Sequence, residues 1–240
     1  MKVMILAAGR GARMAPLTDS CPKPLLPIAG KPLIVHHLEK LAAAGFQDII
    51  INHAWLGEQI EQTLGNGQQW GLRIHYSPEA QALETGGGVF QALPFLRNAQ
   101  DTDEENDEPF LLVNGDVWTE WDYRHARAMR LAKDDVAALW LVPNPEHNSK
   151  GDFLLQGTRV IDLSENISDP DTLTFSGISL LRPSLWEGRT AGCYPLAPML
   201  RQAMQNNAVS GSLLEATWVD VGTPQRLAAL EQYLTSEIAH

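Results

Sequence analysis

The sequence predicts an α/β protein whose mostly parallel, Rossmann-like sheet is covered by helices on both faces. Apolar strand candidates alternate with amphipathic helix candidates over residues 1–142. The strand candidates are almost continuously apolar, as strands buried on both faces of a sheet are. Beyond Pro143, short strand candidates follow one another directly, which predicts a small antiparallel elaboration. We therefore expect one domain, 1–240, with a first part at about 1–142 and a second part at about 143–240.

Each element is predicted from an apolar run or from a helix boundary. Runs rich in Val, Ile and Leu predict strands at 3–7, 48–52, 72–76, 110–113 and 136–142. Pro32 and Gly45 mark the start and the end of the first helix. Further helices are expected at 55–64, 86–96 and 123–133. In the second part, strands at 153–156, 159–163 and 173–181 precede helices at 195–205 and 223–234.

Composition excludes general binding to polyanions. The chain has 240 residues, of which 44% are hydrophobic, and a formal net charge of -11. Nucleic-acid backbones and anionic membranes repel such a protein unless its basic residues form a patch. We therefore expect small-molecule partners, with no nucleic acid and no membrane. The oligomeric state stays open, and a monomer is compatible with the composition.

Cysteine content and the N-terminal residues predict a cytoplasmic protein. Cys21 and Cys193 are too few and too far apart for a disulfide framework or a zinc site, which favours a reducing compartment. The apolar run at 3–8 is shorter than the roughly seven to fifteen residues of a secretion signal. No window approaches the roughly twenty apolar residues of a membrane span.

The turn after the first strand has the composition of a phosphate-binding loop. Gly9 and Gly11 allow backbone amides to approach phosphate oxygens, and Arg13 adds a planar fork of donors. Met14 occupies the third glycine position of a dinucleotide fingerprint, and no Walker A lysine follows. Two glycines alone are also compatible with a tight turn that carries a surface arginine.

A longer pattern gives this loop a specific meaning. The segment 9–18 is followed by Lys23 between two prolines and by the start of the next helix. In this order of residues the sequence resembles the sugar-phosphate nucleotidyltransferases, and the resemblance extends over essentially the whole chain. It implies a nucleotidyltransferase sheet in which Arg13 and Lys23 are catalytic and contact the nucleotide's phosphates. Backbone contacts to the nucleotide are implied for the loop residues Ala8, Gly9, Gly11 and Ala12.

Two aspartates resemble the metal ligands of this family. Asp116 follows the strand at 110–113, and Asp220 lies in a Trp-Val-Asp-Val-Gly-Thr segment. The resemblance implies that they bind Mg²⁺. Two hard oxygen ligands suit an ion that also binds phosphate oxygens and keeps several waters. An aspartate between a strand and a helix can also be a cap or turn residue, which is the alternative for Asp116.

Other segments resemble the base-binding and sugar-binding parts of the family. The nucleotide-binding residues implied here are Glu84, Gly86 and Gly87, and the substrate-binding residues are Asn114, Asp152 and Gly177. A simple turn residue is the alternative for Asp152. Other members carry a glutamate and a lysine where this chain has Leu163-Ser164-Glu165-Asn166, so the cation for the acceptor phosphate stays unassigned.

The resemblance also implies a reaction. Matches at 52–57, 84–88, 114–119 and 218–223 imply transfer of a uridylyl group from UTP to N-acetylmuramic acid α-1-phosphate in peptidoglycan recycling. The products are UDP-N-acetylmuramic acid and pyrophosphate. Only one helix is predicted after Asp220, so we expect this chain to differ from members that carry a left-handed β-helix. The alternatives are a guanylyltransferase acting on a heptose 1-phosphate and a non-catalytic nucleotide-sensing subunit of the same fold.

Charge considerations add two expectations. The carboxylates of an acidic segment are Asp101, Asp103, Glu104, Glu105, Asp107 and Glu108. This segment is expected to form a solvated loop outside the catalytic site, because its charges would oppose triphosphate binding. The lactyl carboxylate of the sugar needs either water or a cation. Lys150 and Arg182 are the candidates for that cation.

Overall fold

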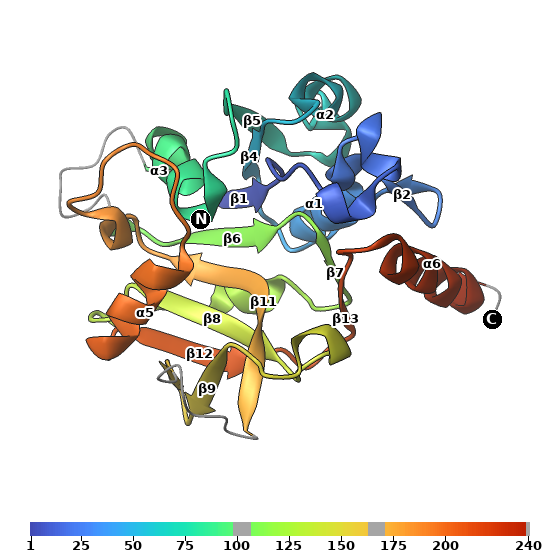
Figure 1. Cartoon of the computed structure of the whole chain (residues 1–240). Coiled ribbons are helices and arrows are strands. Elements are labelled where there is room, and N and C mark those ends of the chain that lie inside the picture. The colour runs from blue at the N-terminus through green and yellow to red at the C-terminus, as the bar shows by residue number, and fades with distance from the viewer. Residues whose placement is uncertain (98–106, 163–170, 239–240) are drawn as a thin grey trace.

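The computed structural model describes residues 1–97, 107–162 and 171–238, with side chains to residue 236 (Figure 1). Most of the expected acidic loop lies outside these ranges, as does the segment Leu163-Ser164-Glu165-Asn166. No helix in the described ranges is long and apolar enough to cross a membrane.

A nine-stranded sheet in the described residues forms the centre of the chain, in the order β5-β4-β1-β6-β11-β8-β12-β10-β9. Its parallel part comprises β5 (Arg73–Pro78), β4 (Asp48–His53), β1 (Val3–Leu6) and β6 (Phe110–Asn114). The remaining strands are β11 (Thr172–Leu181), β8 (Ala137–Val142), β12 (Val209–Leu213), β10 (Arg159–Ile161) and β9 (Phe153–Gln156). Strands β10 and β11 run against the others. The predicted fold class is confirmed, and the antiparallel elaboration is part of the same sheet.

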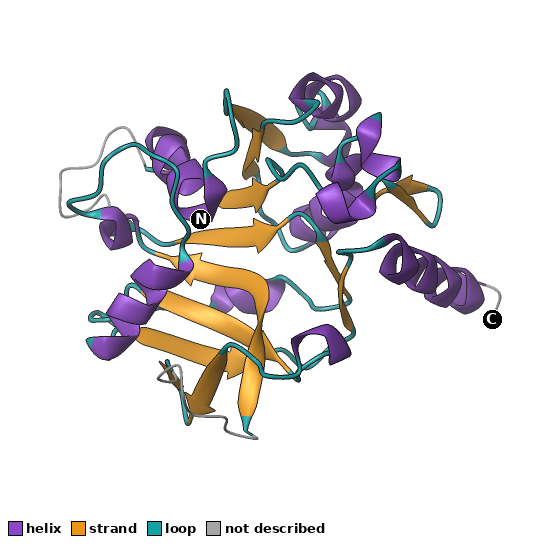
Figure 2. Cartoon of the chain, viewed as in Figure 1, coloured by secondary structure: helices purple, strands orange, loops and turns teal. Residues whose placement is uncertain are grey.

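Helices cover both faces of the sheet (Figure 2). They are α1 (Leu33–Ala43), α2 (Gly57–Leu64), α3 (Glu84–Leu96), α4 (Arg124–Ala128) and α5 (Ala197–Gln205). Helix α6 (Pro224–Ile238) lies beside the large sheet and packs in a separate core (Figure 1). Successive residues of a strand point to opposite faces. Accordingly, Val3 and Ile5 pack in a core with α1 and α2, whereas Met4 packs in a second core with α3 and α5. Strand β1 is therefore buried on both faces.

Two short sheets were not predicted. Strand β2 (Pro27–Ile28) pairs with β3 (Lys31–Pro32), and β7 (Val117–Thr119) pairs with β13 (Trp218–Asp220). Strands of two or three residues are too short to show a hydrophobic period. The strand β12 was also missed, because its Ser-Gly-Ser centre has low strand propensity. Gly211 is nevertheless required there, since a Cβ would lie 2.5 Å from Val160 Cγ2.

The predicted helix at 123–133 is wrong in length. Helix α4 spans only Arg124–Ala128, and Met129 has an extended backbone. Met129 and Leu131 both pack against the core that contains α1. Their two-residue spacing suits an extended chain and would place them on different sides of a helix.

His37 links helix α1 to the strand that follows Asp116. The ring is 2% exposed, and its Nδ1 and Nε2 lie 2.8 Å from Tyr123 Oη and 2.7 Å from Val117 O. Burial lowers the pKa of His37 from 6.5 to about 4. The ring is therefore neutral at pH 7, with one nitrogen donating to the carbonyl and the other accepting from the hydroxyl.

We expect the free energy of unfolding to fall as the pH is lowered from 6.5 to 4. In this window the unfolded chain binds a proton at His37 that the folded chain does not, so the loss totals about 3 kcal/mol. Urea unfolding at a series of pH values measures it. His37→Gln should be less stable than the wild type at pH 8. Between pH 4 and 6.5 its free energy of unfolding should vary less steeply with pH, by the equivalent of up to one bound proton. An unchanged slope would contradict the assignment.

Candidate functional site

A cleft lies at the carboxyl ends of the parallel strands, where ligands of open α/β sheets bind. Its cavity volume is about 230 Å³. Three strand ends contribute Leu6, Asn52 and Asn114, and the connections after them contribute the rest of the lining. The lining residues named by the sequence analysis are Ala8, Gly9, Lys23, Glu84, Asn114 and Asp116. The fold therefore brings half a dozen predicted site residues to one cavity.

A buried polar network that the sequence analysis missed shapes one wall of this cleft. Asn52 Oδ1 accepts from Ala7 N at 3.0 Å, and Asn52 Nδ2 donates to Glu79 Oε1 at 2.7 Å. Glu79 Oε2 in turn accepts from Leu83 N at 2.8 Å, just before helix α3. The network ties the ends of β1, β4 and β5 to the start of α3. The family resemblance included Asn52 in its match at 52–57, but it gave no indication of these hydrogen bonds.

The phosphate loop is divided between the cleft and its surroundings. Ala8 and Gly9 line the cleft, whereas Gly11 packs behind it with φ of +66°. A Cβ on Gly11 would lie 3.2 Å from Lys23 Cβ, so this glycine allows the loop to approach Lys23. Ala12 and Arg13 are exposed on the 3-10 helix Ala12–Met14. Arg13 has no side-chain partner in the described part of the chain, which leaves its guanidinium available.

Lys23 is the buried cation of the site. The residue is only 7% exposed, and Nζ donates to Asp116 Oδ2 at 2.6 Å. Pro22 and Pro24 flank it, and Lys23 begins a short 3-10 helix, so the backbone that carries this ammonium group is stiff. The Asp116 side chain is 39% exposed, which leaves it accessible from the cleft.

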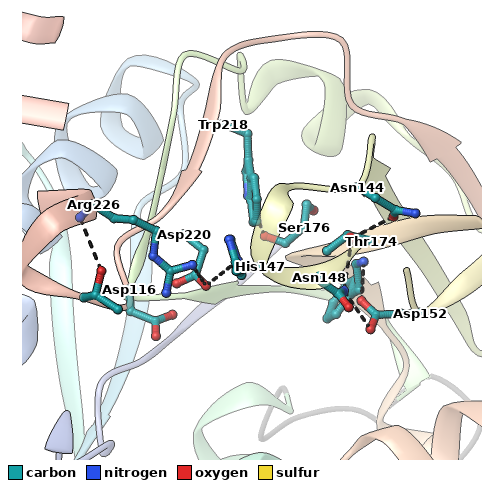
Figure 3. Close-up of polar contacts among 12 residues, drawn as sticks. Asp116, Asn144, His147, Asn148, Asp152, Thr174, Ser176, Trp218, Asp220 and Arg226 are labelled. Carbon is teal, nitrogen blue, oxygen red and sulfur yellow. Dashed lines mark hydrogen bonds and ion pairs between the residues drawn. The ribbon is translucent and has the colours of Figure 1, made fainter. Parts of the chain in front are cut away.

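Asp116 and Asp220 are brought together by the β7–β13 pair. Asp220 lies opposite Val117, and Val221 N donates to Asp116 O at 2.9 Å. Figure 3 shows Asp220 between His147 and Arg226, with Asp116 nearby. Asp220 Oδ2 lies 3.1 Å from His147 Nε2 and 3.0 Å from Arg226 Nη1.

The arrangement at Asp220 was not predicted from the sequence. Arg226 Nε and Nη1 are both buried, and Nη1 forms an ion pair with the Asp220 carboxylate. Gly222 leaves space for the Arg226 guanidinium, which a Cβ at that position would clash with. His147 comes from a loop far away in the sequence, so no local pattern could have indicated its contact with Asp220.

The two aspartates fit a partial magnesium site. Within the described ranges no group of three His, Cys, Asp or Glu residues is placed to hold a metal ion. Mg²⁺ is commonly bound by one or two carboxylates, with phosphate oxygens and water as its other ligands. Two oxygen donors beside a phosphate-sized cleft match that requirement, whereas zinc would need nitrogen or sulfur ligands in larger number.

A second cavity of about 280 Å³ adjoins the cleft. The two cavities share Thr85 and Asn114 as lining residues, so they adjoin at these two residues. The second cavity is lined mainly by apolar side chains from β9, β11 and α5, together with Asp152 and Arg201. An apolar wall with a few polar groups is typical of a small-molecule site.

Asp152 lines this second cavity and also holds its walls together. Its Oδ2 accepts from Phe175 N at 2.8 Å, and its Oδ1 accepts from Asn148 Nδ2 at 3.2 Å (Figure 3). Both oxygens therefore have protein partners. The two interpretations of Asp152, as a substrate-facing residue and as a turn residue, are compatible in this structure.

The glycines at the start of α3 differ in position from Glu84. Glu84 lines the cleft, whereas Gly86 and Gly87 pack against the segment 192–195 behind it. A Cβ on Gly86 would lie 2.8 Å from Tyr194 O, and a Cβ on Gly87 would clash with Gly192 O. These two glycines position the helix and do not line the cleft.

The two cations suggested for the sugar carboxylate do not line the second cavity. Arg182 lies at the opposite edge of the sheet, where Nε donates to Asp135 O at 2.9 Å and Nη1 to Asp107 O at 2.8 Å. The expectation for Arg182 is therefore wrong, because β11 carries it away from the cleft. Lys150 is exposed, and its carbonyl accepts from Thr172 Oγ1 at 2.8 Å.

Gly177 gives space to Asn114. Its φ is +78°, and a Cβ would lie 2.7 Å from Asn114 Nδ2. We expect Gly177→Ala to displace Asn114 and raise KM several-fold for the ligand that occupies the two adjoining cavities. Gly157→Ala is the matched control, because its φ is +60° and nothing lies within 4 Å of the added Cβ. Both variants should lose about 1 kcal/mol of stability from backbone strain. Equal KM values for the two would contradict this prediction.

Comparison with known proteins identifies the family. The family model described as Nucleotidyl transferase matches residues 2–237. The chain belongs to the nucleotidyl transferase family. This result confirms the resemblance inferred from the sequence.

Two curated relatives match nearly the whole chain. N-acetylmuramate alpha-1-phosphate uridylyltransferase from Neisseria meningitidis serogroup B is 51% identical over 231 residues, which cover 95% of both chains. The protein of the same name from Caulobacter vibrioides is 32% identical over 251 residues, with 96% of both chains covered. Among solved structures, HddC from Yersinia pseudotuberculosis complexed with GMP-PN has a TM-score of 0.75 at 20% identity, covering 97% of this chain and 99% of its own. This last likeness shows the shared fold.

Proposed function

We propose that this protein transfers the uridylyl group of UTP to N-acetylmuramic acid α-1-phosphate, giving UDP-N-acetylmuramic acid and pyrophosphate. The observation that carries the proposal is the 51% identity to the Neisseria enzyme across 95% of both chains. Because the match covers 95% of both chains, it includes the base-binding and sugar-binding loops as well as the phosphate-binding residues. The reaction belongs to peptidoglycan recycling.

The two cavities divide the substrates between them. The cleft with Lys23 takes the phosphates of UTP, with Ala8 and Gly9 offering backbone amides. The second cavity takes the sugar, with Asn114 at the boundary. Arg13 is exposed at the phosphate loop and can turn toward the triphosphate when it binds. Glu84, Gly86 and Gly87 position the start of α3 against the base.

The chemistry requires alignment and charge neutralisation. An oxygen of the sugar phosphate attacks the α-phosphorus of UTP, a new P–O bond forms, and the bond to the β-phosphate oxygen breaks in line. The attacking oxygen is already anionic, so no general base is needed. Lys23 is placed to neutralise charge on the phosphates, and such preorganised charge is the main contribution to phosphoryl transfer.

We further propose that Asp116 and Asp220 hold a magnesium ion. When bound, this ion would supply positive charge to the phosphate oxygens. His147 and Arg226 restrain the Asp220 carboxylate, and the Arg226 guanidinium compensates part of its charge. Lys23 does the same for Asp116, and binding of substrate phosphates gives its Nζ a second anionic partner.

We propose a cytoplasmic enzyme that acts as a monomer on small molecules, without nucleic acid. Both cysteines in the described residues are free, as a reducing compartment requires. The negative net charge supports the absence of a nucleic-acid partner. Size-exclusion chromatography with light scattering measures the mass in solution, and a dimer would overturn the proposed monomer.

A matrix of substrates tests the reaction. UTP and GTP are each combined with N-acetylmuramic acid 1-phosphate, N-acetylglucosamine 1-phosphate and a heptose 1-phosphate, and pyrophosphate release is measured with and without magnesium. The proposed function requires the highest kcat/KM for UTP with the muramic substrate, and loss of turnover with EDTA. A preference for GTP and the heptose would identify a guanylyltransferase. No pyrophosphate with any pair would identify a non-catalytic subunit.

A further inference from the structure

The acceptor proposed above carries two anionic groups, and only one of them takes part in the reaction. The phosphate on C1 must reach the α-phosphorus, so it lies at the cleft with Lys23. The carboxylate of the lactyl ether on C3 is attached elsewhere on the sugar ring. It therefore lies in the second cavity or at its mouth. Burial of this carboxylate without a partner would be costly.

Arg201 is the one residue with a positive charge among the described residues that line the second cavity. It lies in the middle of α5 and does not line the cleft that holds Lys23. Apolar side chains surround it on this wall, including Phe153, Phe175 and Leu200. These apolar neighbours exclude water from one side of the cation, which reduces the screening of its charge on that side.

The local contacts hold the guanidinium and leave part of it free. Arg201 Nε donates to Asp162 Oδ1 at 2.9 Å, and Cζ lies 5.8 Å from the centre of the Phe153 ring. The terminal nitrogens Nη1 and Nη2 have no partner in the part of the chain that the structure describes. The side chain is 47% exposed, so a ligand can reach it. A planar fork that is oriented by one carboxylate can bind a second one with its remaining donors.

The other acid of the cavity, Asp152, is held by neutral donors, so Arg201 is the group among the described lining residues that attracts an anion. Both oxygens of Asp152 already accept hydrogen bonds, from Phe175 N and from Asn148 Nδ2. Asp162 is compensated by Arg201 itself, and its side chain is 22% exposed. We infer that Arg201 binds the lactyl carboxylate and so distinguishes N-acetylmuramic acid 1-phosphate from sugar phosphates without that group. This inference rests on the proposed function.

Arg201→Gln tests the inference with two acceptors that differ in the lactyl ether. With UTP, kcat/KM for N-acetylmuramic acid 1-phosphate should fall by about 10- to 100-fold, the usual effect of losing a charged hydrogen bond. The value for N-acetylglucosamine 1-phosphate should change by less than about twofold, since that sugar lacks the carboxylate. Most of the loss should lie in KM. Arg201→Lys should keep part of the preference, because it keeps the charge.

Arg73→Gln is the matched control. It also removes one arginine that is paired with an aspartate, but Arg73 lies at the start of β5, away from both cavities. Its ratio of kcat/KM for the two sugars should equal that of the wild type. Circular dichroism and thermal melting verify that both variants are folded.

The outcomes separate this inference from the proposed function. If the wild type prefers the muramic substrate and Arg201→Gln keeps that preference, the inference is wrong and the function stands. If both sugars lose activity equally, Arg201 contacts the phosphate common to them, and the inference is again wrong. If the wild type does not prefer the muramic substrate, the proposed function fails, and the inference fails with it.

Discussion

Asp116→Asn and Asp220→Asn are each expected to lower kcat by at least about a thousandfold, the scale of removing a principal source of electrostatic stabilisation. The two carboxylates are the oxygen donors that β7 and β13 bring together beside the cleft. Asparagine keeps the shape and one oxygen but removes the negative charge that a magnesium ion requires. Pyrophosphate release at saturating substrate measures kcat.

The structure also predicts an effect of these two variants on stability. Each aspartate is paired with a poorly exposed cation, Lys23 in one case and Arg226 in the other. Loss of the charge leaves that cation without its partner, which is expected to cost about 1–3 kcal/mol. Asp19→Asn is the control, because Asp19 pairs with Arg10 on an exposed surface. It should keep both activity and melting temperature. Near-normal magnesium-dependent turnover in either site variant would disprove that residue's metal role.

Lys23→Met is expected to lower kcat/KM by about a hundredfold to a thousandfold, as removal of one preorganised donor to a transition state does. Methionine keeps the length and the apolar body of the buried side chain, so the packing beside Gly11 should survive. The variant also leaves Asp116 without its ammonium partner, so the affinity for magnesium should increase. Steady-state kinetics and a magnesium titration measure the two effects.

Lys31→Met provides the matched control for Lys23. Lys31 also pairs with a carboxylate, that of Glu39, but both side chains are well exposed and neither lines the cleft. Its kcat/KM should stay within about twofold of the wild type, because exposed ion pairs contribute little. Equal losses in the two variants would mean that Lys23 acts only through the general charge of the surface.

The cleft at the ends of the parallel strands could be predicted from the sequence, because its residues directly follow recognisable apolar strands. Residues just after parallel strands meet at one edge of the sheet, and the family resemblance implied site roles for Gly9, Asn114 and Asp116 there. The apolar runs that define those strands are strong signals. Their positions agreed with the structure to within two residues at each end of β4 and β6.

The remainder depends on contacts between distant segments, which have no local signal. His147 lies near Asp220, and Glu79 near Asn52, only because the tertiary fold brings these distant segments together. Arg201 was not considered, since nothing in the helix sequence distinguishes a cavity-facing arginine from a solvated one. Arg182 was misassigned because it follows β11, whose last residues lie opposite the first residues of β6, whereas the cleft lies at the other end of β6.

The pairing of β7 with β13 joins parts of the chain that are far apart, as in the hydrogen bond from Thr119 Oγ1 to Thr217 O across 98 residues. The segment that carries Asp220 packs with α6 in a small core of its own, around Ile28, Leu33, Trp118, Val221 and Leu230. This unit meets the large sheet through Trp218, which packs against the core containing α1 and donates from Nε1 to Ser176 O at 2.8 Å. Its opening would break these contacts and leave most of the two large cores intact. One carboxylate would then leave the active site while the nucleotide cleft stays folded. Partial opening of this unit would thus switch off catalysis at urea concentrations at which most of the secondary structure persists.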